Sequence, residues 1–421
     1  MSHPTAREQP PERIFLVFVN TDVSEDDYVE AELEGLCVAV GAEAVGSLRQ
    51  RVGKPTRPTF IGKGKVEELT SYAAEVEADT IVIDTELSGT QIRNLEEAVG
   101  RRVIDRTQLI LDIFARRART KEGQLQVELA QLRYRLPRLM SAWTKFERQR
   151  GGIGMRGPGE TQLERDRRTV NKRISKLSAE IDGHSRHRAL QRENRKAKPH
   201  SVVAIVGYTS AGKSTLMNRL VDADVLADAM PFATLDPTTR KLELDKGFSC
   251  FLVDTVGFIR RLPTQLVAAF RGTLEEVVHA DLLVHVVDAS LEDWELQRDL
   301  VLDTVRELGA EDVPMITVFN KIDLLSDSSV ATRLVAEWPD SVAISATVGT
   351  GIPDLLDLIV AKCESKLELV KALIPYDQTR LVESCHQFGR VLLKDYREDG
   401  VYLEAELVPE MRAKLERYEV P

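Results

Sequence analysis

One short segment constrains this chain more than any other feature. The apolar run Val202–Val206 has strand character and leads into Gly207-Tyr-Thr-Ser-Ala-Gly-Lys-Ser214, and Thr215–Val221 follows with helical character. This spacing matches the phosphate-binding pattern GxxxxGK[ST]. Glycines let backbone N–H groups turn inward, and the helix N-terminus adds partial positive charge. We therefore expect an α/β sheet that binds nucleotide phosphates, with Lys213 on the β- and γ-phosphates and the Ser214 hydroxyl on Mg²⁺.

Two later segments predict which base is bound. Asn320-Lys-Ile-Asp323 directly follows the predicted strand Met315–Phe319. An Asp carboxylate at this place can accept hydrogen bonds from guanine N1–H and N2–H₂, a donor pair that adenine lacks. Ser345-Ala-Thr347 follows the predicted strand Val342–Ile344 and can offer a backbone N–H to guanine O6. The order of these segments after the phosphate loop indicates guanine nucleotides.

A third segment is predicted to respond to the γ-phosphate. Asp254-Thr-Val-Gly257 closes the predicted strand Phe251–Val253. The carboxylate can hold a water of the Mg²⁺ shell, and the Gly257 N–H can meet the γ-phosphate, so the following loop can sense hydrolysis. Phe258 comes next, where many GTPases have a Gln that orients the attacking water. A phenyl ring cannot do this, which predicts slow intrinsic hydrolysis completed by a partner or another residue.

The segment Phe232-Ala-Thr-Leu-Asp-Pro-Thr-Thr-Arg240 is predicted to supply a second Mg²⁺ hydroxyl. We choose Thr234, although physical reasoning leaves Thr238 and Thr239 open. The full set of predicted nucleotide-binding residues is Gly207, Tyr208, Thr209, Ser210, Ala211, Gly212, Lys213, Ser214, Thr215, Phe232, Ala233, Thr234, Leu235, Asp236, Asp254, Thr255, Val256, Gly257, Asn320, Lys321, Ile322, Asp323, Ser345, Ala346 and Thr347. Lys213, Thr234 and Gly257 are predicted to act in hydrolysis, and Ser214 and Thr234 to bind the metal.

Charge is distributed very unevenly along the chain. Residues 116–198 contain 23 Lys and Arg against 9 Asp and Glu, a net charge of +14 within a protein of net charge −10. Two long polar helices around the glycine-rich segment Gly151–Glu160 would form a helical hairpin here. One-signed charge of this size predicts that the hairpin faces a polyanion.

The pattern of apolar residues predicts four modules. These are an N-terminal α/β domain with a parallel sheet (1–112), the basic helical hairpin (113–200), the P-loop G domain (201–366) and a small C-terminal α+β domain (367–421). No apolar run reaches the roughly 20 residues of a membrane span. The scattered cysteines Cys37, Cys250, Cys363 and Cys385 are expected to be free and buried.

Four segments together resemble the HflX family of GTPases, within the Obg–HflX group. They are Phe232–Arg240, Asp254–Phe258, Ile61-Gly-Lys-Gly-Lys65 and Gly151–Glu160, and the likeness extends over essentially the whole chain. The resemblance implies a protein that binds the 50S ribosomal subunit through rRNA and ribosomal proteins, splits 70S ribosomes and also hydrolyses ATP. The family commonly has Asn where this chain has Ser210, which puts potassium-assisted hydrolysis in doubt.

We accordingly expect a Mg²⁺-dependent GTPase that converts GTP to GDP and acts as a ribosome-splitting factor. Two rival hypotheses are a ribosome-assembly GTPase and an ATP-dependent RNA remodeller whose G domain is regulatory. A signalling GTPase without RNA fits the basic hairpin least. A monomer in the cytoplasm is expected, with peripheral membrane association as the alternative location.

Overall fold

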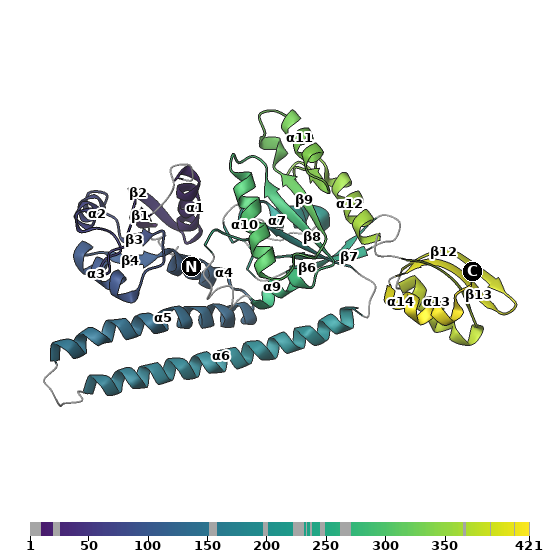
Figure 1. The fold of residues 1–421 in the computed structure, drawn as a ribbon, viewed down its shortest axis with the longest axis horizontal. Helices are drawn as coiled ribbons and strands as arrows, with labels where there is room; N and C mark the ends of the chain where they lie inside the picture. The colour runs from purple at the N-terminus through teal and green to yellow at the C-terminus, as the bar shows by residue number, and fades with distance from the viewer. Residues whose placement is uncertain are drawn as a thin grey trace, which may run out of the picture. The chain divides into compact units, whose positions relative to one another are not determined.

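The described residues of the computed structural model form three β-sheets, each with its own helices, and two long helices (Figure 1). The structure describes residues 10–19, 26–150, 158–196, 201–221, 231–232, 234–235, 238–244, 249–261, 271–364, 368–387, 389–407 and 409–420. The chain divides into two compact units. The first comprises 1–182, 230–235 and 261–270, and the second comprises 183–229, 236–260 and 271–421.

A parallel sheet forms the N-terminal domain in the order β2-β1-β3-β4, which confirms the predicted α/β fold. Its strands are β1 (Glu12–Val19), β2 (Ala42–Gln50), β3 (Thr80–Ile83) and β4 (Arg102–Asp105), and its helices are α1 (Asp26–Ala39), α2 (Lys63–Glu75), α3 (Gly89–Val99) and α4 (Arg106–Arg117). Parallel strands need crossover helices, which here alternate with the strands. The segment Ile61–Lys65 contains the start of α2, with Gly62 as the N-cap of the helix. Ile61, just before the cap, is fully buried.

Two long helices follow, α5 (Lys121–Arg150) and α6 (Pro158–Lys196), with Pro137 inside α5. Leu125 and Leu129 of α5 pack with Leu177 of α6, and Arg173 of α6 donates to the Glu128 carboxylate at 2.6 and 2.7 Å. These contacts form the predicted helical hairpin. Residues 151–157 of its glycine-rich turn lie outside the described residues.

The G domain is built on a second sheet, in the order β10-β9-β8-β5-β7-β6. The strands are β5 (Val202–Gly207), β6 (Thr238–Glu243), β7 (Ser249–Asp254), β8 (Leu282–Asp288), β9 (Met315–Asn320) and β10 (Ser341–Ala343). Helices α7 (Lys213–Val221), α9 (Arg271–Val278), α10 (Trp294–Glu307), α11 (Ser329–Glu337) and α12 (Ile352–Glu364), with the 3₁₀ turn η2 (Ile322–Leu324), connect them. Only β6 is antiparallel to its neighbour among these described strands, and the sequence had not predicted it.

A three-stranded antiparallel sheet, β11-β13-β12, forms the C-terminal domain and confirms the predicted α+β class. It contains β11 (Glu368–Ile374), β12 (Gly389–Arg397), β13 (Gly400–Leu407), α13 (Thr379–Gln387) and α14 (Pro409–Leu415), with the 3₁₀ turns η3 (Tyr376–Gln378) and η4 (Glu416–Tyr418). The four cysteines are free and buried, as expected. None of the described helices is long and apolar enough to cross a membrane.

Candidate nucleotide-binding site

The glycine loop connects the end of β5 to the start of α7, and its conformation depends on residues without side chains. Gly207 has φ 155°, and a Cβ there would lie 2.4 Å from the carbonyl oxygen of Val286. Gly212 has φ 97°, and a Cβ there would lie 2.3 Å from Nδ2 of Asn320. Any other residue at these two positions would displace a strand of the sheet or the Asn320 amide. The loop therefore keeps its backbone N–H groups at the N-terminus of α7.

Lys213 is the first residue of α7 and is almost fully buried. Its Nζ donates to the carbonyl oxygens of Gly207 at 3.1 Å and Tyr208 at 2.7 Å. Burial lowers the pKa of Lys213 to about 8, and the nearby Asp254 carboxylate opposes that shift. A buried ammonium whose acceptors are neutral carbonyls is a favourable partner for a phosphate, which carries the compensating charge.

Ser214 and Asp254 bring hard oxygen atoms together beside the loop. The Ser214 hydroxyl donates to Oδ2 of Asp254 at 2.9 Å, and Asp254 is fully buried. Thr255 supports this geometry because its hydroxyl donates to the Ile205 carbonyl at 2.7 Å. Mg²⁺ prefers hydroxyl, carboxylate, phosphate and water oxygens, so this pair fits the ion. No cluster of three or more His, Cys, Asp or Glu side chains offers another metal site within the described ranges.

Asn320 ties three loops together. Its Nδ2 donates to the Ala211 carbonyl of the glycine loop at 2.9 Å, and its Oδ1 accepts from the Ala346 N–H at 3.0 Å. The sequence placed Asn320 among the nucleotide-binding residues but did not predict its bond to Ala346. The segments expected to bind the phosphates and the base thus share one buried side chain.

The other base-recognition residues lie at the same strand end. Lys321 has φ 65° and ion-pairs with Asp288 at 2.6 Å, while Asp323 lies on η2 with its side chain exposed. Ser345 is buried and its Oγ accepts from the Val348 N–H, whereas Thr347 is exposed. An exposed carboxylate on a short rigid turn can receive two donors from guanine.

Asp288 is a site residue that the sequence analysis missed. It is the last residue of β8, and its Oδ1 also accepts from the Ser290 N–H and hydroxyl. The signal was available, because an Asp directly after a buried strand lies at the carboxyl edge where ligands bind. Its ion pair with Lys321 holds the base-recognition loop.

The segment around Thr234 belongs to the first unit. Phe232 is buried there, and its ring meets the Phe114 ring of α4 edge-on with centroids 4.6 Å apart. Ala233 and Asp236 lie outside the described residues. The nucleotide contacts of Phe232, Thr234 and Leu235 therefore stay predictions.

The glycine loop, the buried Lys213, the Ser214–Asp254 pair and the exposed Asp323 define a P-loop GTPase. Sequence comparison then identifies the family. Family profiles described as GTP-binding GTPase N-terminal, GTP-binding GTPase middle region and 50S ribosome-binding GTPase match residues 27–115, 117–195 and 202–321. The chain belongs to the HflX GTPase family, and it is a GTP hydrolase with GTP as substrate and GDP as product.

Two relatives illustrate the likeness. GTPase HflX of Caldanaerobacter subterraneus is 46% identical over 97% of this chain and 94% of its own length. GTPase HflX of Escherichia coli is 42% identical over 88% of this chain and 87% of its own. A crystal structure of a GTP-binding protein from Sulfolobus solfataricus with GDP is more distant, at 24% identity and a TM-score of 0.45, covering 84% of this chain and 99% of that one.

Proposed function

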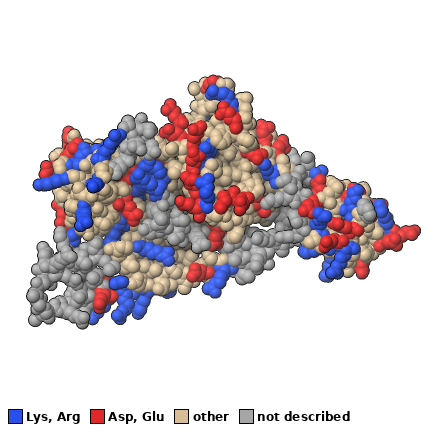
Figure 2. Space-filling model, in the orientation of Figure 1, with Lys and Arg blue, Asp and Glu red and all other residues tan. Residues whose placement is uncertain are grey.

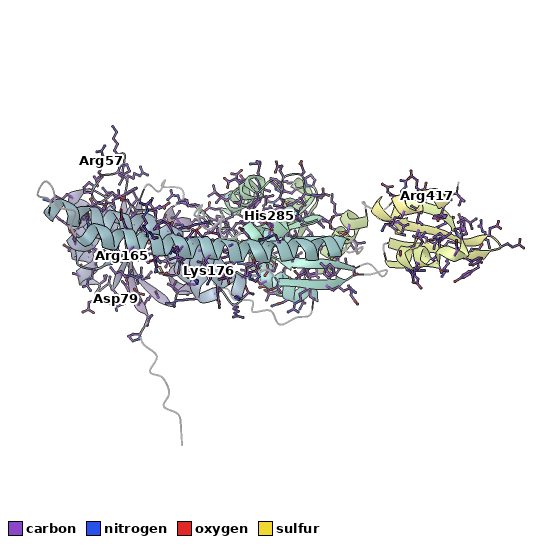
Figure 3. The ribbon with its side chains drawn as sticks, turned by 90° about the horizontal axis from the view of Figure 1, so that it is seen from below. Arg57, Asp79, Arg165, Lys176, His285 and Arg417 are labelled. Atoms are coloured by element: carbon purple, nitrogen blue, oxygen red, sulfur yellow. The ribbon has the colours of Figure 1, made fainter. Side chains whose placement is uncertain are left out.

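We propose that this protein is a Mg²⁺-dependent switch that binds the 50S subunit in its GTP state and splits 70S ribosomes. The proposed binding to the ribosome rests on the charge of α6. Between residues 164 and 176, six basic side chains stand against two acidic ones, and all eight are exposed. Figure 2 shows Lys and Arg side chains along the lower edge of the hairpin, with a few Asp and Glu side chains beside them. Arg165 and Lys176 lie along the same helix in Figure 3.

The surface on α6 suits a nucleic-acid backbone. Arg173 is held by Glu128, while a shallow groove is lined by Glu164, Arg167, Arg168, Asn171, Lys172 and Ser175. Side chains at this spacing follow one face of a helix. Lys and Arg that neutralise phosphates release counterions, so we expect the affinity for rRNA to fall steeply with salt.

The nucleotide site supplies the switch in this proposal. Ser214 and Thr234 would hold Mg²⁺, which neutralises phosphate charge when bound. Lys213 and the Gly257 N–H would bind the γ-phosphate, and the segments around Thr234 and Gly257 would change conformation with it. Phe258 is 3% exposed and lacks a group that could orient water. A ribosomal partner would then complete the hydrolytic site.

The first test is pelleting of the purified protein with 50S subunits in GDP or in a non-hydrolysable GTP analogue. We expect at least tenfold tighter binding with the analogue, since each ~1.4 kcal/mol of differential affinity is tenfold. Equal binding in both states would overturn the proposal.

Charge reversal locates the contact. The triple variant Arg167→Glu, Arg168→Glu and Lys172→Glu should abolish pelleting while GTP binding remains normal. A matched triple variant uses exposed basic residues of other elements than the hairpin helices: Lys63→Glu, Lys241→Glu and Arg306→Glu. If both variants lose binding equally, the hairpin is not the specific contact.

Sucrose gradients of 70S ribosomes distinguish splitting from the rival functions. Dissociation into subunits with the GTP analogue supports a splitting factor. Binding to 50S without dissociation would favour the assembly GTPase, and dissociation that requires ATP would favour the RNA remodeller.

A further inference from the structure

Tyr208 occupies the second position of the glycine loop. The backbone of this loop is predicted to bind the phosphates, and the Tyr208 side chain has no role in that prediction. The side chain is buried, at 3% exposure. Its phenolic oxygen accepts a hydrogen bond from the backbone N–H of Arg260 at 2.8 Å. Arg260 lies three residues beyond Gly257, in the loop predicted to sense the γ-phosphate. Both residues belong to the second unit.

Two backbone hydrogen bonds lie beside this contact. The Phe258 N–H donates to the Gly207 carbonyl at 3.1 Å, and the Thr209 N–H donates to the Phe258 carbonyl at 2.8 Å. They extend the parallel pairing of β5 with β7 beyond the ends of both strands, through a bridge between Tyr208 and Phe258. The segment from Gly257 to Arg260 is thus fastened along the glycine loop.

This fastened segment lies where a γ-phosphate has to be received. A Cβ built on Gly257 would be 3.0 Å from Lys213 Nζ and 3.0 Å from Cγ2 of Thr209. Gly257 thus lies close against the Lys213 ammonium, which itself donates to the Gly207 and Tyr208 carbonyls. A γ-phosphate oxygen that accepts from this ammonium has to enter beside it, where Gly257 now lies, and so shifts the segment away from the loop. We refer to the arrangement before this shift as the closed segment.

We propose that the Tyr208 hydroxyl is a latch that stabilises the closed segment, so that Tyr208 is a positioning residue that sets the ratio of GTP to GDP affinity. GDP has no γ-phosphate and tolerates the closed segment, whereas GTP has to displace it. A ligand whose competent conformation is only partly populated binds more weakly by that fraction. The latch thereby lowers the affinity for GTP without changing that for GDP.

Tyr208→Phe tests the latch, because it removes the hydroxyl and keeps the ring. One net hydrogen bond corresponds to about a three- to tenfold change in an equilibrium. We expect the Kd for a non-hydrolysable GTP analogue to fall by about three- to tenfold, with the Kd for GDP unchanged. Tyr134→Phe is the matched control, since Tyr134 is also a buried tyrosine with a hydrogen-bonded hydroxyl, but in the N-terminal domain. Its two Kd values should both stay unchanged.

Amide hydrogen exchange distinguishes the latch from a purely structural role of Tyr208, because a structural role would not make the exchange of the Arg260 amide depend on the nucleotide. The Arg260 amide should be protected in wild-type protein with GDP and exchange faster with the GTP analogue, and Tyr208→Phe should remove the protection with GDP. This wild-type comparison also decides the matter if the variant does not fold. An unchanged affinity ratio in a folded variant would overturn the latch. Equal protection of Arg260 in both nucleotide states would overturn it as well.

Discussion

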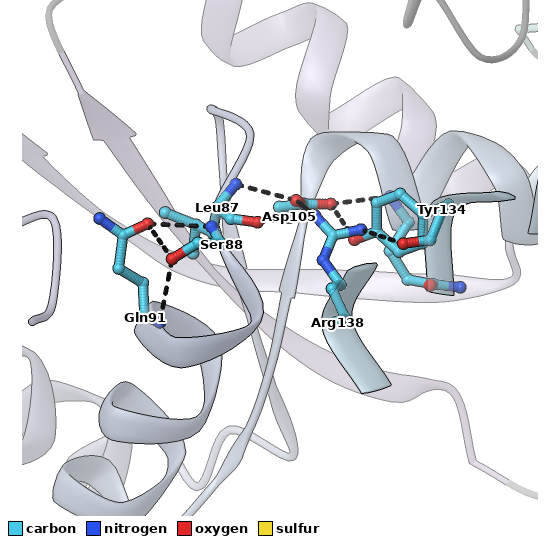
Figure 4. A network of polar contacts seen from close by, with 7 residues as sticks. Leu87, Ser88, Gln91, Asp105, Tyr134 and Arg138 are labelled. Atoms are coloured by element: carbon cyan, nitrogen blue, oxygen red, sulfur yellow. Dashed lines mark hydrogen bonds and ion pairs between the residues drawn. The ribbon is translucent and has the colours of Figure 1, made fainter. Parts of the chain in front are cut away.

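The N-terminal sheet and the G-domain sheet both carry polar residues at the carboxyl ends of their parallel strands, but they differ in what those residues bind. In the N-terminal sheet, Asp84 follows β3 and Asp105 ends β4, and both are fully buried. Arg106 ion-pairs with Asp84 at 2.8 Å and also pairs with Glu32. Figure 4 shows the second half of this charged cluster, in which Asp105 accepts from Leu87 N–H, the Tyr134 hydroxyl and Arg138. The buried cations and anions at this edge form ion pairs with one another.

At the G-domain edge, the glycine loop and Lys213 form a site suited to a phosphate. The hydrogen-bond acceptors of Lys213 are the neutral carbonyls of Gly207 and Tyr208, and the donors of the loop are backbone N–H groups. Glycines at 207 and 212 allow this close approach. The comparison teaches that a parallel sheet provides the edge, while the residues of one loop decide whether that edge is filled by side chains or by a ligand.

The largest effect should come from breaking the N-terminal cluster. Arg106→Ala leaves Glu32 without its guanidinium partner and Asp84 with the longer contact to Arg261 at 3.8 Å, which should lower the free energy of unfolding by about 3–5 kcal/mol. Chemical denaturation monitored by circular dichroism measures this change. The affinity of the G domain for GTP should stay the same, and a parallel loss of nucleotide binding would show that the two edges are not independent.

Removal of the corresponding cation in the G domain should act on binding instead. Lys213→Ala deletes the donor to the phosphates and should weaken GTP binding by about 10²-fold or more, corresponding to ~3 kcal/mol. Titration with a fluorescent GTP analogue measures the affinity. Lys241→Ala, on exposed β6 of the same sheet, is the control and should leave it unchanged. Normal affinity of Lys213→Ala would contradict the assignment of the site.

The pH dependence of nucleotide binding tests the contrast between the ion-paired edge of the N-terminal sheet and the phosphate-binding edge of the G-domain sheet. A bound phosphate raises the pKa of Lys213 above its value of about 8 in the free protein, so binding takes up a proton. Affinity should be constant with respect to this group below pH 8 and fall by up to ~10-fold per pH unit above it. Calorimetry in buffers of different ionisation enthalpy counts the protons. Lys213→Arg cannot titrate in this range, and retention of the same pH slope in that variant would exclude Lys213 as its origin.

The smallest expected effect concerns a single hydrogen bond. Tyr134→Phe removes one of the donors to Asp105, whose Oδ1 still accepts from Gln108 N–H and whose Oδ2 still accepts from Arg138. Stability should fall by ~1 kcal/mol, because the remaining donors keep the carboxylate satisfied. Thermal unfolding of the two proteins checks this. A loss as large as that of Arg106→Ala would mean that the cluster behaves as one indivisible network.

Much of the site was predictable because its residues act through local chemistry. The glycine loop, Asp254 and Asn320 each directly follow a buried strand, and strand order alone brings such positions to one edge. The ion pair of Asp288 with Lys321 and the contact of Tyr208 with Arg260 depend on side chains that meet across loops. Sequence spacing does not encode those meetings, so they required the structure.

The missed strands have a similar explanation. β6 lies at the edge of its sheet and alternates weakly, since Leu242 is its only buried side chain. β11 does alternate, with Val370, Ala372 and Ile374 buried, but it follows directly on α12 and a three-residue connection outside the described ranges. An edge strand pairs with a single neighbouring strand, and its formation depends on that pairing more than on the strand preference of its own residues.

The bridging position of Asn320 has a consequence for pieces of the nucleotide. Because one amide contacts both the Ala211 carbonyl and the Ala346 N–H, ordering of either loop restricts the other. Guanosine and pyrophosphate, offered as separate molecules, should then bind cooperatively, each strengthening the other. In the variant Asn320→Ala, the two fragments would bind independently of each other. The intact nucleotide would then bind more weakly, because binding of its base would no longer favour binding of its phosphates.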